Sequence, residues 1–195
     1  EEAIKENDSA IKEKKQKEKD KRKQIDFGGK TYSAEPDDFM DLAQAVKDSF
    51  DDSTVFDSAQ NGLSNLSDVG KSKHSGGQGG GGGSSSKPDA VMSDEQKLAI
   101  GLAGEIYAGE WIKQYHRKVH NIEVNDDSWV SKYRDRILAT DKGDDSLGYD
   151  FIVKLKTVTY YYEVKASQGN SYAFQMGPTE IAHAQRCTAD KKQKY

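Results

Sequence analysis

A run of glycine and serine limits how this chain can fold more than any other feature of its sequence. Gly76-Gly77-Gln78 is followed by five glycines and three serines. A stretch without apolar side chains cannot offset the entropy lost on ordering it, so we expect a flexible linker over residues 67–92. Folding therefore depends on the residues on either side of this linker.

The composition excludes several classes of protein. Only 34% of the 195 residues are hydrophobic and 32% are charged, which is lean for a chain that is packed throughout. The net charge of −4 offers no global attraction to nucleic acid, so such binding needs a local basic surface. Cys187 is the single cysteine, which excludes an intrachain disulfide and favours a reduced, cytoplasmic compartment. No run approaches the ~20 apolar residues that span a bilayer, so we expect no membrane partner.

Two segments precede the linker. Residues 1–30 begin almost entirely with Lys, Glu, Asp and Gln, which predicts a charged, solvated helical segment. Residues 31–66 contain a short amphipathic helix that suits docking onto a partner. Alone it cannot bury much surface, so we expect its partner elsewhere in a larger protein. Its apolar side chains recur at helical spacing: Phe39, Leu42, Val46 and Phe50.

Residues 93–195 have the pattern of a folded domain. Ser93 and Gln96 form a capping-box pair at the start of a helix with an apolar stripe. Strands are predicted at 128–131, 149–155 and 158–165, with a hairpin turn at Lys156-Thr157. A second helix begins near Pro178. The order helix, strands, helix predicts an α/β fold with a mixed sheet, and one further strand is expected after Tyr195.

The predicted hairpin brings three chemically useful side chains together. Residues two apart in a strand share a face, so Glu163 and Lys165 project together, and Asp150 begins the neighbouring strand. Mg²⁺, or Mn²⁺ as a substitute, binds few such oxygen ligands and keeps water for the rest. Lys165 would lower the pKa of a metal-bound water or stabilise charge on a phosphate. These parts suit phosphodiester hydrolysis. From spacing alone, a cross-strand salt bridge is the alternative.

Further candidates lie around this centre. Glu105, on the first helix, is a third metal ligand or an ordinary surface glutamate. His116 and His120 lie four apart, but without a metalloprotease glutamate between them they indicate a solvated helix face. Candidates for binding the nucleic-acid backbone, with ordinary surface charge as the alternative, are Lys132, Arg134 and Arg136.

Two segments of the chain are similar to a known superfamily. Gly148-Tyr149-Asp150-Phe151 and Tyr162-Glu163-Val164-Lys165-Ala166-Ser167 resemble the PD-(D/E)xK nucleases, and most closely the C-terminal domain of NO VEIN-type proteins. The resemblance covers roughly Lys97 to Tyr195, with Tyr149 in place of the superfamily's proline. It implies a restriction-endonuclease-like core. It also implies that Asp150, Glu163 and Lys165 are the catalytic triad, with Glu105 as the first-helix glutamate.

The resemblance also implies a function. It indicates a Mg²⁺-dependent nuclease domain acting on DNA, within a larger protein that includes an Hsp90-like ATPase and serves antiviral defence. The alternative is a catalytically inactive nuclease-like fold that binds nucleic acid or protein. The retained triad favours the nuclease, whereas the acidic net charge favours the binding module.

Overall fold

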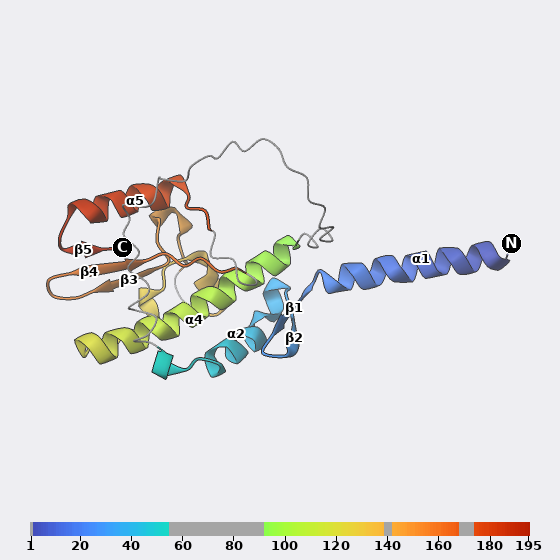
Figure 1. Cartoon of the computed structure of the whole chain (residues 1–195), viewed down its shortest axis with the longest axis horizontal. Helices are drawn as coiled ribbons and strands as arrows, with labels where there is room; N and C mark the ends of the chain where they lie inside the picture. Colours follow the sequence, from blue (N-terminus) through green and yellow to red (C-terminus); the bar gives the residue numbers. More distant parts are fainter. Residues whose placement is uncertain (1, 55–91, 139–141, 168–173) are drawn as a thin grey trace, which may run out of the picture. The chain divides into compact units, whose positions relative to one another are not determined.

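The computed structural model describes residues 2–54, 92–138, 142–167 and 174–195 (Figure 1). Almost all of the predicted linker at 67–92 lies outside these ranges. The described residues up to 50 and from 92 onward form one compact unit, to which the short 3₁₀ turn η2 (Asp52–Thr54) does not belong. None of the described helices is long and apolar enough to cross a membrane.

The first segment contains a helix and a β-hairpin. Helix α1 spans Glu2–Lys21, as the charged composition predicts. Strands β1 (Gln24–Phe27) and β2 (Lys30–Ser33) then pair antiparallel, with Phe27 opposite Lys30. The connecting Gly28 and Gly29 have φ angles of 58° and 78°, which glycine adopts without strain and which a two-residue hairpin turn requires. This hairpin was not predicted.

Helix α2 (Phe39–Asp48), which follows the 3₁₀ turn η1 (Pro36–Asp38), packs against the helix that begins after the predicted linker. The apolar stripe of this helix faces the protein interior, because the side chains of Phe39, Leu42 and Val46 are buried in the main hydrophobic core. The expectation that this helix needs a partner elsewhere is therefore wrong. Its partner is in the same chain, and the two sides of the glycine-rich run build one core.

Helix α4 (Asp94–His120) begins and ends at clear local signals. Ser93 Oγ accepts a hydrogen bond from the Gln96 N–H at 3.1 Å, and the Gln96 side chain accepts one from the Ser93 N–H at 3.0 Å. This is the predicted capping box. At the other end Asn121 takes a left-handed conformation (φ 54°), and its N–H bonds to the carbonyl of Arg117.

The main sheet consists of β3 (Phe151–Lys154), β4 (Thr159–Tyr162) and the short β5 (Gln193–Lys194). The first two strands are antiparallel and joined by the predicted turn, in which the Leu155 N–H bonds to the carbonyl of Val158. Strand β5 lies parallel to β4, so the sheet is mixed. Strand β5, which ends just before Tyr195, was not among the predicted strands.

The strand predicted at 128–131 is reduced to one bridge between Trp129 and Phe151. Three 3₁₀ turns occupy the described parts of the region between α4 and β3: η4 (Asp126–Ser128), η5 (Lys132–Arg136) and η6 (Asp145–Leu147). The mixed α/β class is confirmed, and its described elements position the side chains discussed below.

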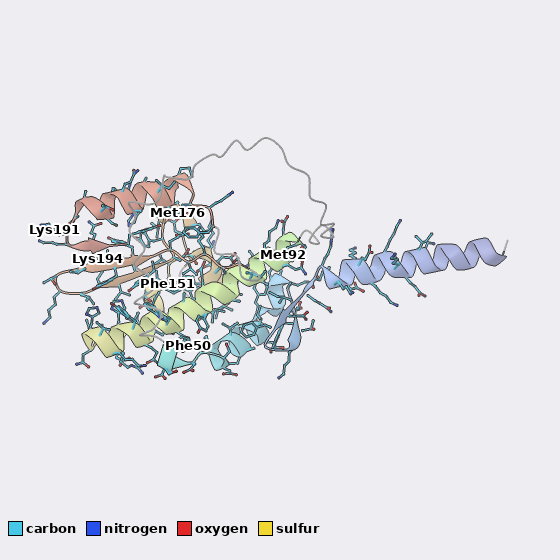
Figure 2. The ribbon with its side chains drawn as sticks, in the orientation of Figure 1. Phe50, Met92, Phe151, Met176, Lys191 and Lys194 are labelled. Carbon is cyan, nitrogen blue, oxygen red and sulfur yellow. The ribbon has the colours of Figure 1, made fainter. Side chains whose placement is uncertain are left out.

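The sheet has helices on both faces. Tyr160 and Tyr162 stack on each other and contact His116 of α4. Tyr161, which points the opposite way, contacts His183 of α5 (Pro178–Ala189). Phe151, labelled in Figure 2, stacks on Trp129 with ring centroids 5.8 Å apart. Successive tyrosines of β4 therefore pack both faces, as expected for a strand of period two.

Candidate functional site

The centre of the site is the pair Asp150 and Glu163. Phe151 lies opposite Tyr162 in the β3–β4 register, so Asp150 and Glu163 are the next opposed pair, just past the ends of these strands. The Asp150 N–H donates to the Tyr162 carbonyl at 2.7 Å, so Asp150 keeps a backbone contact with β4 just past the paired residues. The structure thus brings these two predicted residues together.

Lys165 joins the pair through an ion-pair network. Its Nζ donates to Glu163 Oε1 at 2.6 Å and to Glu180 Oε1 at 2.8 Å. Glu180 was not among the predicted site residues. Its second oxygen accepts the Gly177 N–H at 2.8 Å, which completes the N-terminal cap of α5. The available signal was its position three residues after Gly177 and two after a helix-starting Pro178, where a glutamate normally caps.

Glu105 lies in a different environment. Only 4% of this residue is exposed, so it is not a surface glutamate. Its Oε2 accepts a hydrogen bond from Trp129 Nε1 at 2.5 Å and another from the Ser131 hydroxyl. A buried carboxylate needs such partners, because an unpaired one is costly to desolvate. A cavity of about 20 Å³, enough for one water molecule, also adjoins Glu105.

Two glycines allow the elements that carry these groups to approach closely. A Cβ at Gly104 of α4 would overlap the Cβ of Ala166, directly after Lys165. Gly148 has a φ of 81°, and a Cβ there would lie 2.8 Å from the carbonyl oxygen of Thr179 in α5. The first contact holds the helix of Glu105 against the end of the sheet. The second holds the start of α5 against the loop that leads to Asp150.

The three carboxyl groups share an electrostatic cost. Burial raises the pKa of Glu105 to about 8, and the charge of Asp150 adds to the rise. Burial likewise raises the pKa of Glu163 to about 7 and that of Asp150 to about 6. The Val164 N–H and the Lys165 ammonium oppose the rise at Asp150. Even so, the acidic groups are short of compensating positive charge.

Lys165 and Glu180 stabilise each other's charged forms. Burial lowers the pKa of Lys165, but its hydrogen bonds to Glu163 and Glu180 outweigh that effect and leave the pKa raised. Burial raises the pKa of Glu180, but the hydrogen bonds from Lys165 and the Gly177 N–H leave it lowered. Lys165 is therefore a permanent cation at neutral pH, which suits charge stabilisation better than proton transfer.

The carboxylates of the site are the kind of ligand that Mg²⁺ prefers, but they are not arranged around a common point as in a metal site. Asp150 and Glu163 offer hard oxygen ligands, and Mg²⁺ needs only one or two carboxylates besides water. Among the described residues, however, no group of three His, Cys, Asp or Glu side chains is arranged to hold a metal. Glu105 is engaged with Trp129 and Ser131. The fit thus rests on the pair Asp150 and Glu163.

The predicted nucleic-acid contacts do not behave alike. Lys132 and Arg136 are exposed, although Lys132 Nζ lies 3.9 Å from Asp145 Oδ2. Arg134 is buried, with 7% of the residue exposed, so it is not presented to a phosphate in solution. Lys132 and Arg136 remain candidates for contact with the nucleic-acid backbone.

The histidine pair was wrongly predicted as solvated. His116 has no exposed surface, and its Nε2 lies 2.7 Å from the Tyr162 hydroxyl in a hydrogen bond. Burial, with a smaller effect from His120, lowers the pKa of His116 to about 4. His116 is therefore a neutral core residue that ties α4 to β4.

Comparison with protein-family models, with curated proteins and with solved structures finds no match for this chain. The resemblance to PD-(D/E)xK nucleases therefore stays a prediction from the residues quoted above. The site can be argued only from its own geometry and charge.

Proposed function

We propose that this chain is a divalent-metal-dependent nuclease that hydrolyses phosphodiester bonds of DNA at the Asp150–Glu163–Lys165 centre. The observation that carries the proposal is the register of β3 and β4. Its last pair, Phe151 and Tyr162, is followed by Glu163 on one strand and preceded by Asp150 on the other, and an ammonium lies 2.6 Å from Glu163. This is the donor set that phosphoryl-transfer sites combine: acidic oxygens for a metal and a cation for the phosphate.

Asp150 and Glu163 are the residues that would hold Mg²⁺ or Mn²⁺. Their raised pKa values support this role, because a bound cation would offset the burial and repulsion that disfavour their charged forms. When bound, the metal would supply Lewis-acid activation of the phosphate and of a water molecule. Glu105, whose pKa is raised in part by the charge of Asp150, would act as a further ligand, directly or through water.

The chain's own residues have distinct tasks in this proposal. The Val164 N–H fixes one oxygen of Asp150, which limits the rotation of that carboxylate. Lys165, held by Glu163 and Glu180, would stabilise the negative charge that develops on the phosphate oxygens. The PD-(D/E)xK resemblance assigns the same three residues.

The direct test is cleavage of supercoiled plasmid and of single-stranded DNA with Mg²⁺ or Mn²⁺. We expect Asp150→Ala and Lys165→Ala each to lower the rate by roughly 100-fold or more. Lys154→Ala removes an exposed ammonium from β3 and should cut like wild type. Absence of metal-dependent cutting by the wild type, or equal rates in all four proteins, would refute the proposal.

A second candidate is a nuclease-like fold that binds nucleic acid or protein without cutting. The observation in its favour is that Lys165 forms ion pairs with Glu163 and Glu180, so Glu163 already has a cationic partner within the chain. Calorimetry with Mn²⁺ separates the two candidates. The nuclease requires binding by the wild type that Glu163→Ala abolishes, whereas the binding module predicts no heat from either protein.

A further inference from the structure

The second half of α1, with the two residues that follow it, carries a concentration of positive charge that the rest of the chain lacks. Residues 12–23 contain eight Lys and Arg side chains against three Asp and Glu, a net charge of +5. The chain as a whole has a net charge of −4, so all its other residues together carry −9. The densest local basic surface of the kind that binds a polyanion is therefore in residues 12–23.

Part of this charge falls on one side of the helix. Lys12, Lys15, Lys19 and Arg22 follow one another at spacings of three, four and three residues, which places them on one face. Arg22 keeps its helical position, because its N–H bonds to the carbonyl of Glu18 at 3.3 Å. We name these four residues the basic face. They extend over about 15 Å of helix, at a rise of 1.5 Å per residue.

The basic face is available to a ligand. All four of its residues are exposed, and none of them forms an ion pair with a carboxylate in the described parts of the chain. Glu13 and Asp20 lie on the other side of the helix at this periodicity, and Glu18 lies at the border of the face.

The end of α1 is attached to the helix that carries Glu105. The Ser93 hydroxyl donates to the Arg22 carbonyl at 2.6 Å, and Gln96 Nε2 donates to the carbonyls of Lys21 and Gln24 at 3.1 and 2.8 Å. The capping residues of α4 thus also bind carbonyls at the end of α1 and at the start of β1. A ligand held by the basic face would therefore be held by an element joined to the functional site.

We propose that the basic face of α1 binds the phosphate backbone of nucleic acid without sequence preference. One reason rests on the proposed function: the carboxyl-rich centre repels phosphate, so a nuclease of this charge needs backbone affinity elsewhere. The other reasons, the presence of four cations on one face and their exposure, do not depend on cleavage. Lysine and arginine side chains spaced along a helix suit the phosphates, which carry no base information.

The test is fluorescence anisotropy of the full-length chain with a labelled 20-base-pair duplex, in EDTA so that no metal-dependent cutting occurs. The test variant replaces all four residues of the basic face by Gln, which retains helix propensity. The matched control makes the same charge change with Gln at Lys154, Lys156, Lys191 and Lys192, which are exposed; Figure 2 labels Lys191. A third protein, with Lys12, Lys15 and Lys19 as Arg and Arg22 as Lys, keeps the charge.

We expect the test variant to raise the Kd at 0.1 M salt by at least about tenfold and to reduce the salt slope of log K by roughly 3 to 4. The control and the charge-keeping variant should bind within about twofold of wild type. No binding by wild type, an unchanged Kd in the test variant, or an equal loss in the control would overturn the proposal. So would selective binding to phosphatidylserine vesicles instead of the duplex.

The two proposals fail in different ways. If the Asp150–Glu163–Lys165 centre is inactive but the basic face binds DNA, plasmid cleavage is absent while the expected anisotropy results are still obtained. If the basic face does not bind DNA, the duplex binds equally to wild type and test variant, while cleavage still requires Asp150 and Lys165.

Discussion

The backbone N–H of Val164 donates a hydrogen bond to Oδ2 of Asp150 at 2.7 Å. A main-chain group on the strand that supplies Glu163 and Lys165 thus positions the carboxylate from the opposite strand. The aspartate is therefore a fixed part of the β3–β4 end and does not depend on Lys165 for its orientation.

Asp150→Asn should separate folding from metal binding. The amide oxygen can still accept the Val164 N–H, so the variant should keep the fold. At pH 8 the wild type carries a charge there that burial disfavours, as its pKa of about 6 indicates. The free energy of unfolding of the wild type therefore falls as pH rises from the ordinary pKa of Asp150, 3.8, to its raised value of about 6. The Asn variant does not lose this stability, because its side chain does not titrate. Without metal at pH 8, the free energy of unfolding of the Asn variant should exceed that of wild type by up to about 3 kcal/mol.

Urea unfolding with and without Mn²⁺ checks both effects. Wild type should gain stability on adding Mn²⁺, and Asp150→Asn should not. A gain of equal size in the variant would contradict a metal role for Asp150.

Glu180 has two tasks that two substitutions can distinguish. Glu180→Gln keeps an oxygen for the Gly177 N–H but removes the charge beside Lys165. Its stability should change by less than about 0.5 kcal/mol, while any metal-dependent cleavage should slow by roughly tenfold. Glu180→Ala also removes the cap and should lose a further 1 kcal/mol or so in urea unfolding. Identical stabilities for the two variants would contradict the capping role.

Local signals of the sequence were reliable where the partner residue is close in the chain. The capping box of Ser93 and Gln96 and the turn at Lys156-Thr157 involve neighbours only, and both form. The juxtaposition of Asp150 and Glu163 then followed from strand period and turn length. The Gly28-Gly29 turn between Phe27 and Lys30 gives the same kind of signal, and could have predicted the β1–β2 hairpin.

Long-range packing was not accessible in this way. The glycine-rich run suggested that α2 was separate from α4. The entropic cost of closing a loop rises only slowly with its length, however, so a long connection does not prevent contact across it. His116 was predicted to lie on a solvated helix face because polar side chains are usually exposed. Only the arrangement of Tyr160 and Tyr162 above it shows that the face is covered. The burial of Glu105 and Arg134 depends equally on distant residues.

Helix α2 should contribute to the stability of the whole compact unit. Leu42 is completely buried in the core shared with α4, so Leu42→Ala should lower the free energy of unfolding by about 2–4 kcal/mol. Met40, on the same helix but 56% exposed, provides the control. Met40→Ala should change stability by no more than about 0.5 kcal/mol. If Leu42→Ala leaves the unfolding of α4 unaffected in hydrogen exchange, the two helices do not share one core.

His116 should make the fold sensitive to acid. Its pKa is lowered by burial to about 4, below the 6.5 of an exposed histidine, so the unfolded chain binds more protons between these values. Stability from the neutral ring is complete above pH 6.5 and is lost as pH falls toward 4. At pH 5 this loss is about 2 kcal/mol.

His116→Gln is the informative substitution, because a Gln side chain can hydrogen-bond the Tyr162 hydroxyl but does not titrate. The carboxyl groups of the site change the stability in the opposite direction, because their pKa values are raised. Wild type and variant must therefore be compared with each other at each pH. The stability difference between wild type and variant in urea should shift by about 2 kcal/mol toward the variant between pH 7.5 and pH 5. A difference that stays constant over this range would show that His116 is not held neutral by burial.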